Sequence, residues 1–219
     1  MDKKWHLIVT VGTSAIYNDG IGKRLGPNGH KSLSDRVRLY KGSANKKRSD
    51  NPDLFQSLAA ENRGFFDQLE IFRKKPSNTS QVSAELLSTG EIVPDIKPLD
   101  ILLLTSHTDE GYFAGEVNGE ALSKLYPRIK TSVHQLEGLD QKFDGVFEAL
   151  RYTIDEQHWD ETDGLAFNVT GGFKGTLLYV AAYALDKGAR VYYRHEQMEQ
   201  TMVMELDAAR KVVFRRSRK

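Results

Sequence analysis

The chain of 219 residues contains no cysteine, which excludes disulfide bonds, thiolate nucleophiles and cysteine-ligated zinc. It also lacks long hydrophobic runs: no apolar stretch reaches the length of a membrane span, and the N-terminal residues do not resemble a signal peptide. Neither charge sign dominates, because 31 lysines and arginines face 30 acidic residues, so the chain carries no general signature of polyanion binding. These absences predict a cytoplasmic protein with no DNA and no membrane as partner.

Several familiar catalytic motifs are missing as well. The chain has no Walker A sequence, and no Gly-x-Gly-x-x-Gly follows any predicted strand. The six histidines are scattered without the spacing of a zinc site, and no Gly-x-Ser-x-Gly elbow is present. The sequence therefore predicts neither a bound metal nor a cofactor.

Apolar runs of strand length alternate with segments of helical periodicity, which is typical of an α/β protein. The pattern predicts a single domain over residues 1–219, with a Rossmann-like, doubly wound, mostly parallel sheet and a C-terminal β-hairpin. The predicted strands cover 5–11, 99–104, 129–136, 165–170 and 191–193, and the hairpin covers 202–206 and 211–214. The predicted helices cover 52–72, 82–87, 116–126 and 143–154, with one more that follows Lys174 and ends near Lys187.

The chain is organised around the unit from Leu165 to Arg190. A buried strand leads into Gly171 and Gly172, and this turn opens a helix whose first turn carries Lys174. The first N–H groups of a helix lack intrahelical partners, glycine lets a ligand approach the backbone, and a lysine supplies a mobile positive charge. This combination favours an anion site, although glycine-rich turns of this kind also occur for packing reasons alone.

Three polar turns directly follow buried strands: Gly12–Ser14, Thr105–Thr108 and Thr170–Lys174. Because the carboxyl ends of parallel strands meet at one edge of a sheet, we expect these turns to lie together. A rim rich in hydroxyl groups, with one lysine, suits a phosphodiester better than a metal ion.

A basic, loop-like segment follows the first of these turns. From Asn18 to Asp50 the composition shifts to glycine, serine and asparagine, and lysine and arginine outnumber aspartate. We expect a loop insertion at about residues 18–52, which either covers the ligand or forms a solvated surface.

At these positions the chain resembles the CARF family, the CRISPR-associated Rossmann fold domains of type III CRISPR systems. The resembling segments are Val9–Ser14, Ser83–Leu86, Leu102–Gly111, Asn168–Lys174 and Val191–Glu196. Two features depart from the family pattern: His107 stands where aspartate is common, and the family does not predict the basic insertion.

The resemblance implies a homodimer that binds a cyclic oligoadenylate second messenger across its two-fold axis. It implies catalytic roles for Lys174, Ser14 and Thr13. The ligand-binding residues that it implies are Gly12, Thr105, Ser106, His107, Thr108, Asn168, Thr170, Gly171, Gly172 and Phe173.

Two functions fit the resemblance. The first is a stand-alone ring nuclease, which cleaves the messenger without a metal and ends the antiviral response. The second is a sensor that binds the messenger without chemistry of its own and regulates a partner or an effector domain. An NAD-dependent or nucleotide-dependent enzyme on the same fold is a third class.

Overall fold

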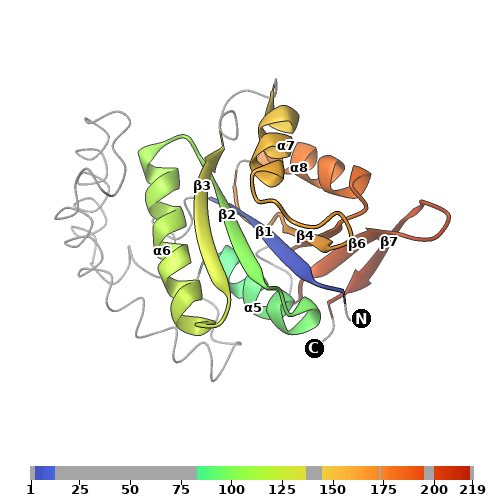
Figure 1. Ribbon diagram of the computed structural model, residues 1–219, viewed down its shortest axis with the longest axis horizontal. Coiled ribbons are helices and arrows are strands. Elements are labelled where there is room, and N and C mark those ends of the chain that lie inside the picture. Colours follow the sequence, from blue (N-terminus) through green and yellow to red (C-terminus); the bar gives the residue numbers. More distant parts are fainter. Residues whose placement is uncertain (1–2, 13–82, 137–144, 173, 195–199, 218–219) are drawn as a thin grey trace.

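The computed structural model describes residues 3–12, 83–136, 145–172, 174–194 and 200–217. A seven-stranded sheet with the order β3-β2-β1-β4-β5-β6-β7 forms its centre (Figure 1). The strands are β1 (Trp5–Val11), β2 (Asp100–Ser106), β3 (Lys130–Leu136), β4 (Gly164–Asn168), β5 (Arg190–Tyr193), β6 (Met202–Leu206) and β7 (Val212–Arg216). Strands β1 to β5 pair in parallel, and β6 and β7 add an antiparallel hairpin. The predicted mostly parallel, Rossmann-like α/β fold is confirmed.

Helices cover both faces of this sheet, as in a doubly wound fold. The helices are α5 (Ala84–Ile96), α6 (Asp109–Leu125), α7 (Val146–Asp155) and α8 (Lys174–Asp186). Figure 1 shows α5 and α6 on one side of the sheet and α7 and α8 on the other. The two hydrophobic clusters have the same division: one contains residues of α5 and α6, and the other contains residues of α7 and α8.

The central strand β1 explains why the sequence pattern is so clear there. Its side chains alternate between the two clusters, with Leu7 and Val9 in one and Ile8 in the other, and all three are fully buried. A strand that is covered on both faces needs apolar residues at nearly every position, so it gives an uninterrupted hydrophobic run.

Helix α5 is longer than the predicted helix at 82–87. Ser88 and Thr89, which look like the end of a helix in the sequence, are fully buried inside it. The hydroxyl of Ser88 donates to the carbonyl of Ala84, and both hydroxyls accept hydrogen bonds from Asn168. The helix continues past these polar residues because their hydroxyl groups have partners in the interior.

Helix α6 starts at Asp109, whereas the sequence predicts a start at residue 116. The prediction is too late because the first turns of the helix contain glycine, which is a poor helix former. The hydroxyl of Thr108 caps the helix and accepts a hydrogen bond from the amide of Gly111 at 3.0 Å. A Cβ atom at Gly111 would lie 2.1 Å from the Ser106 hydroxyl oxygen, and one at Gly115 would lie 2.3 Å from the Thr105 methyl carbon. Glycine lowers helix propensity but lets α6 pack closely on the end of β2.

A buried histidine joins the amino ends of the central strands. The two ring nitrogens of His6 lie 2.9 Å from carboxylate oxygens of Asp100 and Asp163, and the ring stacks on Trp159. These contacts tie β1 to the start of β2 and to the turn before β4. Because His6 lies near the start of β1, this cluster is at the opposite edge of the sheet from the three polar turns.

The predicted helix at 52–72 and the basic insertion at about 18–52 lie outside the described residues. Among the residues that are described, no helix is both long enough and apolar enough to cross a membrane.

Candidate functional site

The carboxyl ends of β2, β1 and β4 lie side by side at one edge of the sheet. The register pairs Val11 with Thr105, and Val9 with Asn168, and all three strands run in the same direction. The described parts of the three polar turns therefore share one edge, as their positions after buried strands predict. The strand order reverses between β1 and β4, and such switch points are where open α/β sheets bind ligands.

The turns after β1 and β4 are in direct contact. A Cβ atom added to Gly12 would lie 2.7 Å from the backbone nitrogen of Gly172, and Gly172 has a φ of +110°. The hydroxyl of Thr10 donates to the backbone oxygens of Asn168 and Gly171 and so links the two turns from below. Both glycines are needed here, one for the close approach of two backbones and the other for its left-handed conformation.

Glu85, in the first turn of α5, inserts its side chain between these two turns. The residue is only 1% exposed, and its Oε1 accepts a hydrogen bond of 2.9 Å from the amide of Gly12. The same oxygen would lie 2.0 Å from a Cβ atom at Gly171. The amide of Gly12 therefore already has an acceptor within the protein. Sequence reasoning missed this role of Glu85, although the residue belongs to the segment Ser83–Leu86 that carries part of the resemblance.

Asn168 organises the interior beneath the turns. Its amide nitrogen donates to the hydroxyls of Ser88 at 2.7 Å and Thr89 at 3.0 Å, and its amide oxygen accepts from the backbone nitrogen of Thr170 at 3.2 Å. The residue is fully buried. The structure thus places the Asn168 side chain in contact with α5, where it supports the turn from inside the protein.

The end of β5 is attached to the same turn. The backbone nitrogen of Arg194 donates to the Thr170 hydroxyl at 3.1 Å, and the Arg194 guanidinium pairs with Glu91 of α5. The other carboxylate oxygen of Glu91 accepts from the amide and the hydroxyl of Thr201, at 2.9 and 2.6 Å. Helix α5 therefore holds the carboxyl ends of β1, β4 and β5 in fixed relative positions.

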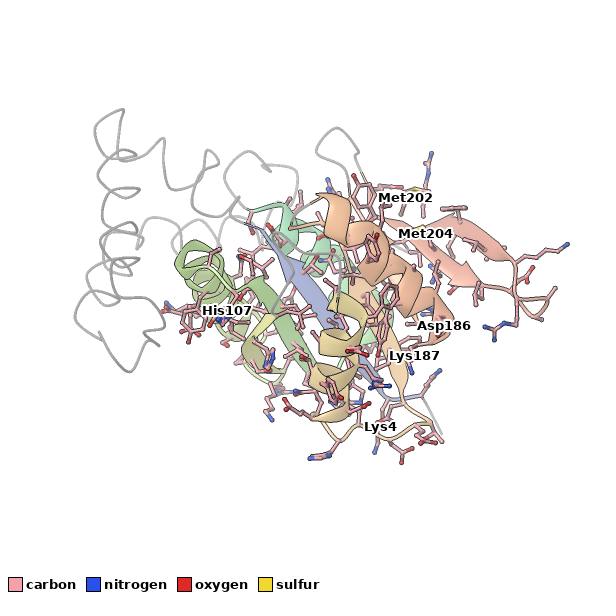
Figure 2. The ribbon with its side chains drawn as sticks, turned by 90° about the horizontal axis from the view of Figure 1, so that it is seen from above. Lys4, His107, Asp186, Lys187, Met202 and Met204 are labelled. Carbon is pink, nitrogen blue, oxygen red and sulfur yellow. The ribbon has the colours of Figure 1, made fainter. Side chains whose placement is uncertain are left out.

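The turn after β2 is shorter than the sequence suggests, because Thr105 and Ser106 belong to β2. Thr105 is fully buried, and the hydroxyls of Ser106 and Thr108 lie 2.8 Å apart. His107 is exposed (Figure 2), on the β2 and α6 side of the molecule and far from Met202 of β6. Only His107 is thus clearly presented to the solvent from this turn.

Of the remaining predicted site residues, the structure describes the backbone of Lys174. Lys174 is the first residue of α8, so the helix begins two positions after Gly172. Thr13, Ser14 and Phe173 lie outside the described residues. Among the described residues, no group of three or more His, Asp or Glu side chains is arranged to hold a metal ion.

The site therefore combines two glycine turns in contact, the first turn of a 13-residue helix, and a buried carboxylate that fixes one of the turns. In a comparison with known protein families, a family model described as CRISPR-associated protein (Cas_APE2256) matches residues 80–205, which is more than half of the chain. The match includes four of the five segments that carry the CARF resemblance. A search of curated proteins found no match.

Proposed function

Because the chain belongs to the Cas_APE2256 family of CRISPR-associated proteins, which supports a role in CRISPR defence, we propose that it is a ring nuclease of the type III response. It binds a cyclic oligoadenylate, most simply cyclic tetra-adenylate, at the interface of a homodimer. It then cleaves the ring without a metal and releases a linear product with a 2′,3′-cyclic phosphate. Loss of the messenger switches the response off.

One observation carries this proposal: α8 begins two positions after Gly172, so the Gly171–Gly172 turn and the start of the helix lie close together in the chain at the switch point of the sheet. Phosphate oxygens bind well to the free N–H groups and the positive end of the dipole at a helix N-terminus. The positive φ of Gly172 belongs to a conformation that exposes backbone donors to a ligand at such sites. This arrangement favours a ligand with phosphodiester groups.

The cleavage uses a nucleophile that the ligand itself supplies. The 2′-oxygen of one ribose attacks the adjacent phosphorus in line, the bond from phosphorus to the 5′-oxygen breaks, and the 5′-oxygen takes up a proton as the 2′-hydroxyl loses one. Holding these atoms in line lowers the barrier by positioning alone. Lys174 and the amides of Gly172 and Phe173 stabilise the charge on the phosphoryl oxygens, at roughly 3 kcal/mol for a well-placed donor. Ser14 and Thr13 orient the attacking ribose.

The surface of α8 supports the second copy that the proposal requires. Leu178 and Tyr179 lie in the first half of this helix and are 74% and 38% exposed, and Phe147 of α7, which is 40% exposed, makes an edge contact with the Tyr179 ring. An exposed apolar surface next to a ligand site is typical of a subunit interface. A two-fold axis there would bring two copies of the rim together around one symmetric ligand.

A non-catalytic sensor is the second candidate. The observation that favours it is that polar groups of the rim already bond to each other within the protein: the Gly12 amide donates to Glu85, and the hydroxyls of Ser106 and Thr108 share a hydrogen bond. A rim of this kind can serve to recognise a ligand without activating any group on it.

One assay separates these functions. The protein is incubated with cyclic tetra-adenylate or cyclic hexa-adenylate in EDTA, and linear products are separated by chromatography. Turnover supports the ring nuclease, and tight binding without turnover supports the sensor. If NAD stabilises the protein against heat and neither oligoadenylate does, an NAD-dependent enzyme is the better conclusion.

A further inference from the structure

The side chain of Glu85 reaches both glycine turns of the candidate site. On one side it accepts the hydrogen bond from the Gly12 amide. On the other, its Oε1, Cγ and Cδ atoms would lie 2.0, 2.4 and 2.5 Å from a Cβ atom at Gly171. The contact is therefore possible only because residue 171 is glycine, and the carboxylate fills the space that this glycine leaves.

The backbone that carries Glu85 is itself held firmly. Ser83 caps α5 by accepting a hydrogen bond from the amide of Leu86, and its hydroxyl donates to the amide oxygen of Asn118 on α6. The side-chain amide nitrogen of Asn168 donates to the hydroxyls of Ser88 and Thr89 in the next turn of α5. All these residues except Leu86 are polar and buried, and a buried polar network with its partners in place keeps its members in one geometry.

We propose that Glu85 is a positioning residue for the cleavage reaction, an inference that rests on the proposed function. Its carboxylate fixes the direction of the Gly12 amide at the carboxyl end of β1, beside the switch point. Because this amide already has an acceptor, the ligand phosphate is left to the Gly171–Gly172 turn and the start of α8. Glu85 acts through the turns that it holds, and it does not touch the ligand.

Two conservative variants separate the effect of the length of the Glu85 side chain from the effect of its negative charge. Glu85→Gln keeps an acceptor oxygen at the same distance from Gly12 but removes the charge. Glu85→Asp keeps the charge but withdraws the oxygen by about one bond length, roughly 1.5 Å, which breaks the hydrogen bond. Glu205 provides the matched control, because its carboxylate on β6 is bonded to Arg190 and Arg215 and is not part of either glycine turn.

The kinetics with cyclic tetra-adenylate in EDTA give the first readout. We expect Glu85→Asp to lower kcat about 100-fold with a much smaller change in Kd, because a displacement of about 1 Å is enough to misalign an in-line attack. Glu85→Gln retains kcat close to that of the wild type, as do Glu205→Gln and Glu205→Asp.

The opposite pattern would overturn the inference. If Glu85→Gln is inactive while Glu85→Asp is active, cleavage depends on the negative charge of Glu85 and not on the length of its side chain. If Glu85→Asp keeps the wild-type kcat, or loses kcat and ligand affinity together, Glu85 does not position the reacting groups.

The amide of Gly12 gives a second readout, which does not depend on activity. In ¹H–¹⁵N spectra, we expect its proton resonance to move upfield in Glu85→Asp and to move much less in Glu85→Gln. If the wild type cleaves no oligoadenylate, the proposed function fails, and the amide alone decides whether Glu85 fixes the turn. An unchanged Gly12 resonance in Glu85→Asp would then overturn the positioning role as well.

Discussion

Gly12 and Gly172 approach each other so closely that a Cβ atom on Gly12 would lie 2.7 Å from the backbone nitrogen of Gly172. These residues follow β1 and β4, the neighbouring strands between which the strand order reverses. The contact leaves no room for a side chain at position 12. The ligand-binding edge that we propose is therefore built from backbone, and the residues around it act mainly by fixing where that backbone lies.

Gly171 is the position where a small substitution should do most harm. In Gly171→Ala the new methyl group meets the buried Glu85 side chain, so we expect the free energy of unfolding to fall by about 1–3 kcal/mol and the affinity for cyclic tetra-adenylate to be lost. Gly188→Ala is the control: Gly188 has a φ of +67° but open space around it, so the cost is backbone strain of about 1 kcal/mol with unchanged affinity. Urea denaturation and calorimetric titration measure both effects. A Gly171→Ala protein that binds as tightly as the wild type would contradict the geometry.

Asn168 should affect stability more than ligand binding. Asn168→Ala leaves the buried hydroxyls of Ser88 and Thr89 without their donor, and we expect a loss of about 1–3 kcal/mol in the free energy of unfolding. Because the amide side chain bonds inside the protein, the folded variant should bind cyclic tetra-adenylate nearly as well as the wild type. Loss of affinity at unchanged stability would instead support the direct ligand contact that the CARF resemblance implies.

Tyr192 should make the free energy of unfolding depend on pH in the alkaline range. Burial raises the pKa of its hydroxyl above the ordinary value of 10.0, and so does the hydrogen bond of 2.7 Å that the hydroxyl donates to Asp95. The unfolded chain loses this proton near pH 10, whereas the folded protein keeps it. The stabilisation that Tyr192 contributes to the free energy of unfolding is therefore fully present below pH 10 and decreases as the pH rises above it. Urea titrations at a series of pH values should give a shallower decline for Tyr192→Phe. Equal slopes for the two proteins would refute this origin of the pH dependence.

Lys174→Ala tests the electrostatic part of the mechanism. We expect the rate of cleavage to fall far more than the affinity, because in the proposed mechanism the ammonium group stabilises charge that is greatest in the transition state. Single-turnover rates and Kd values for cyclic tetra-adenylate give the two quantities. Equal losses in both would make Lys174 a residue of affinity alone.

The fold could be predicted from the sequence where burial leaves a simple pattern. Strand β1 has the predicted bounds, because covering on both faces requires an apolar run. Helices α5 and α6 were predicted too short for two different reasons. Ser88 and Thr89 are polar residues whose partners are distant in the chain, and Gly111 and Gly115 are poor helix formers that close packing on β2 requires.

The site could be predicted only as far as topology reaches. The turns after Val11, Ser106 and Asn168 had to meet at one edge once the strands were taken as parallel. The contact between Gly12 and Glu85 joins residues 73 positions apart, and no local pattern marks it. The role of Asn168 beneath the turn was hidden for the same reason.

The most direct test of the central claim is the origin of the oxygen atoms in the product. Wild-type protein is incubated with cyclic tetra-adenylate and EDTA in water enriched in oxygen-18, and the first linear product is weighed by mass spectrometry. Attack by the 2′-hydroxyl of the ligand adds no water, so the account predicts an unlabelled 2′,3′-cyclic phosphate with the same mass as the intact ring. A first product that carries oxygen-18 from the water, or a ring that stays intact, would contradict it.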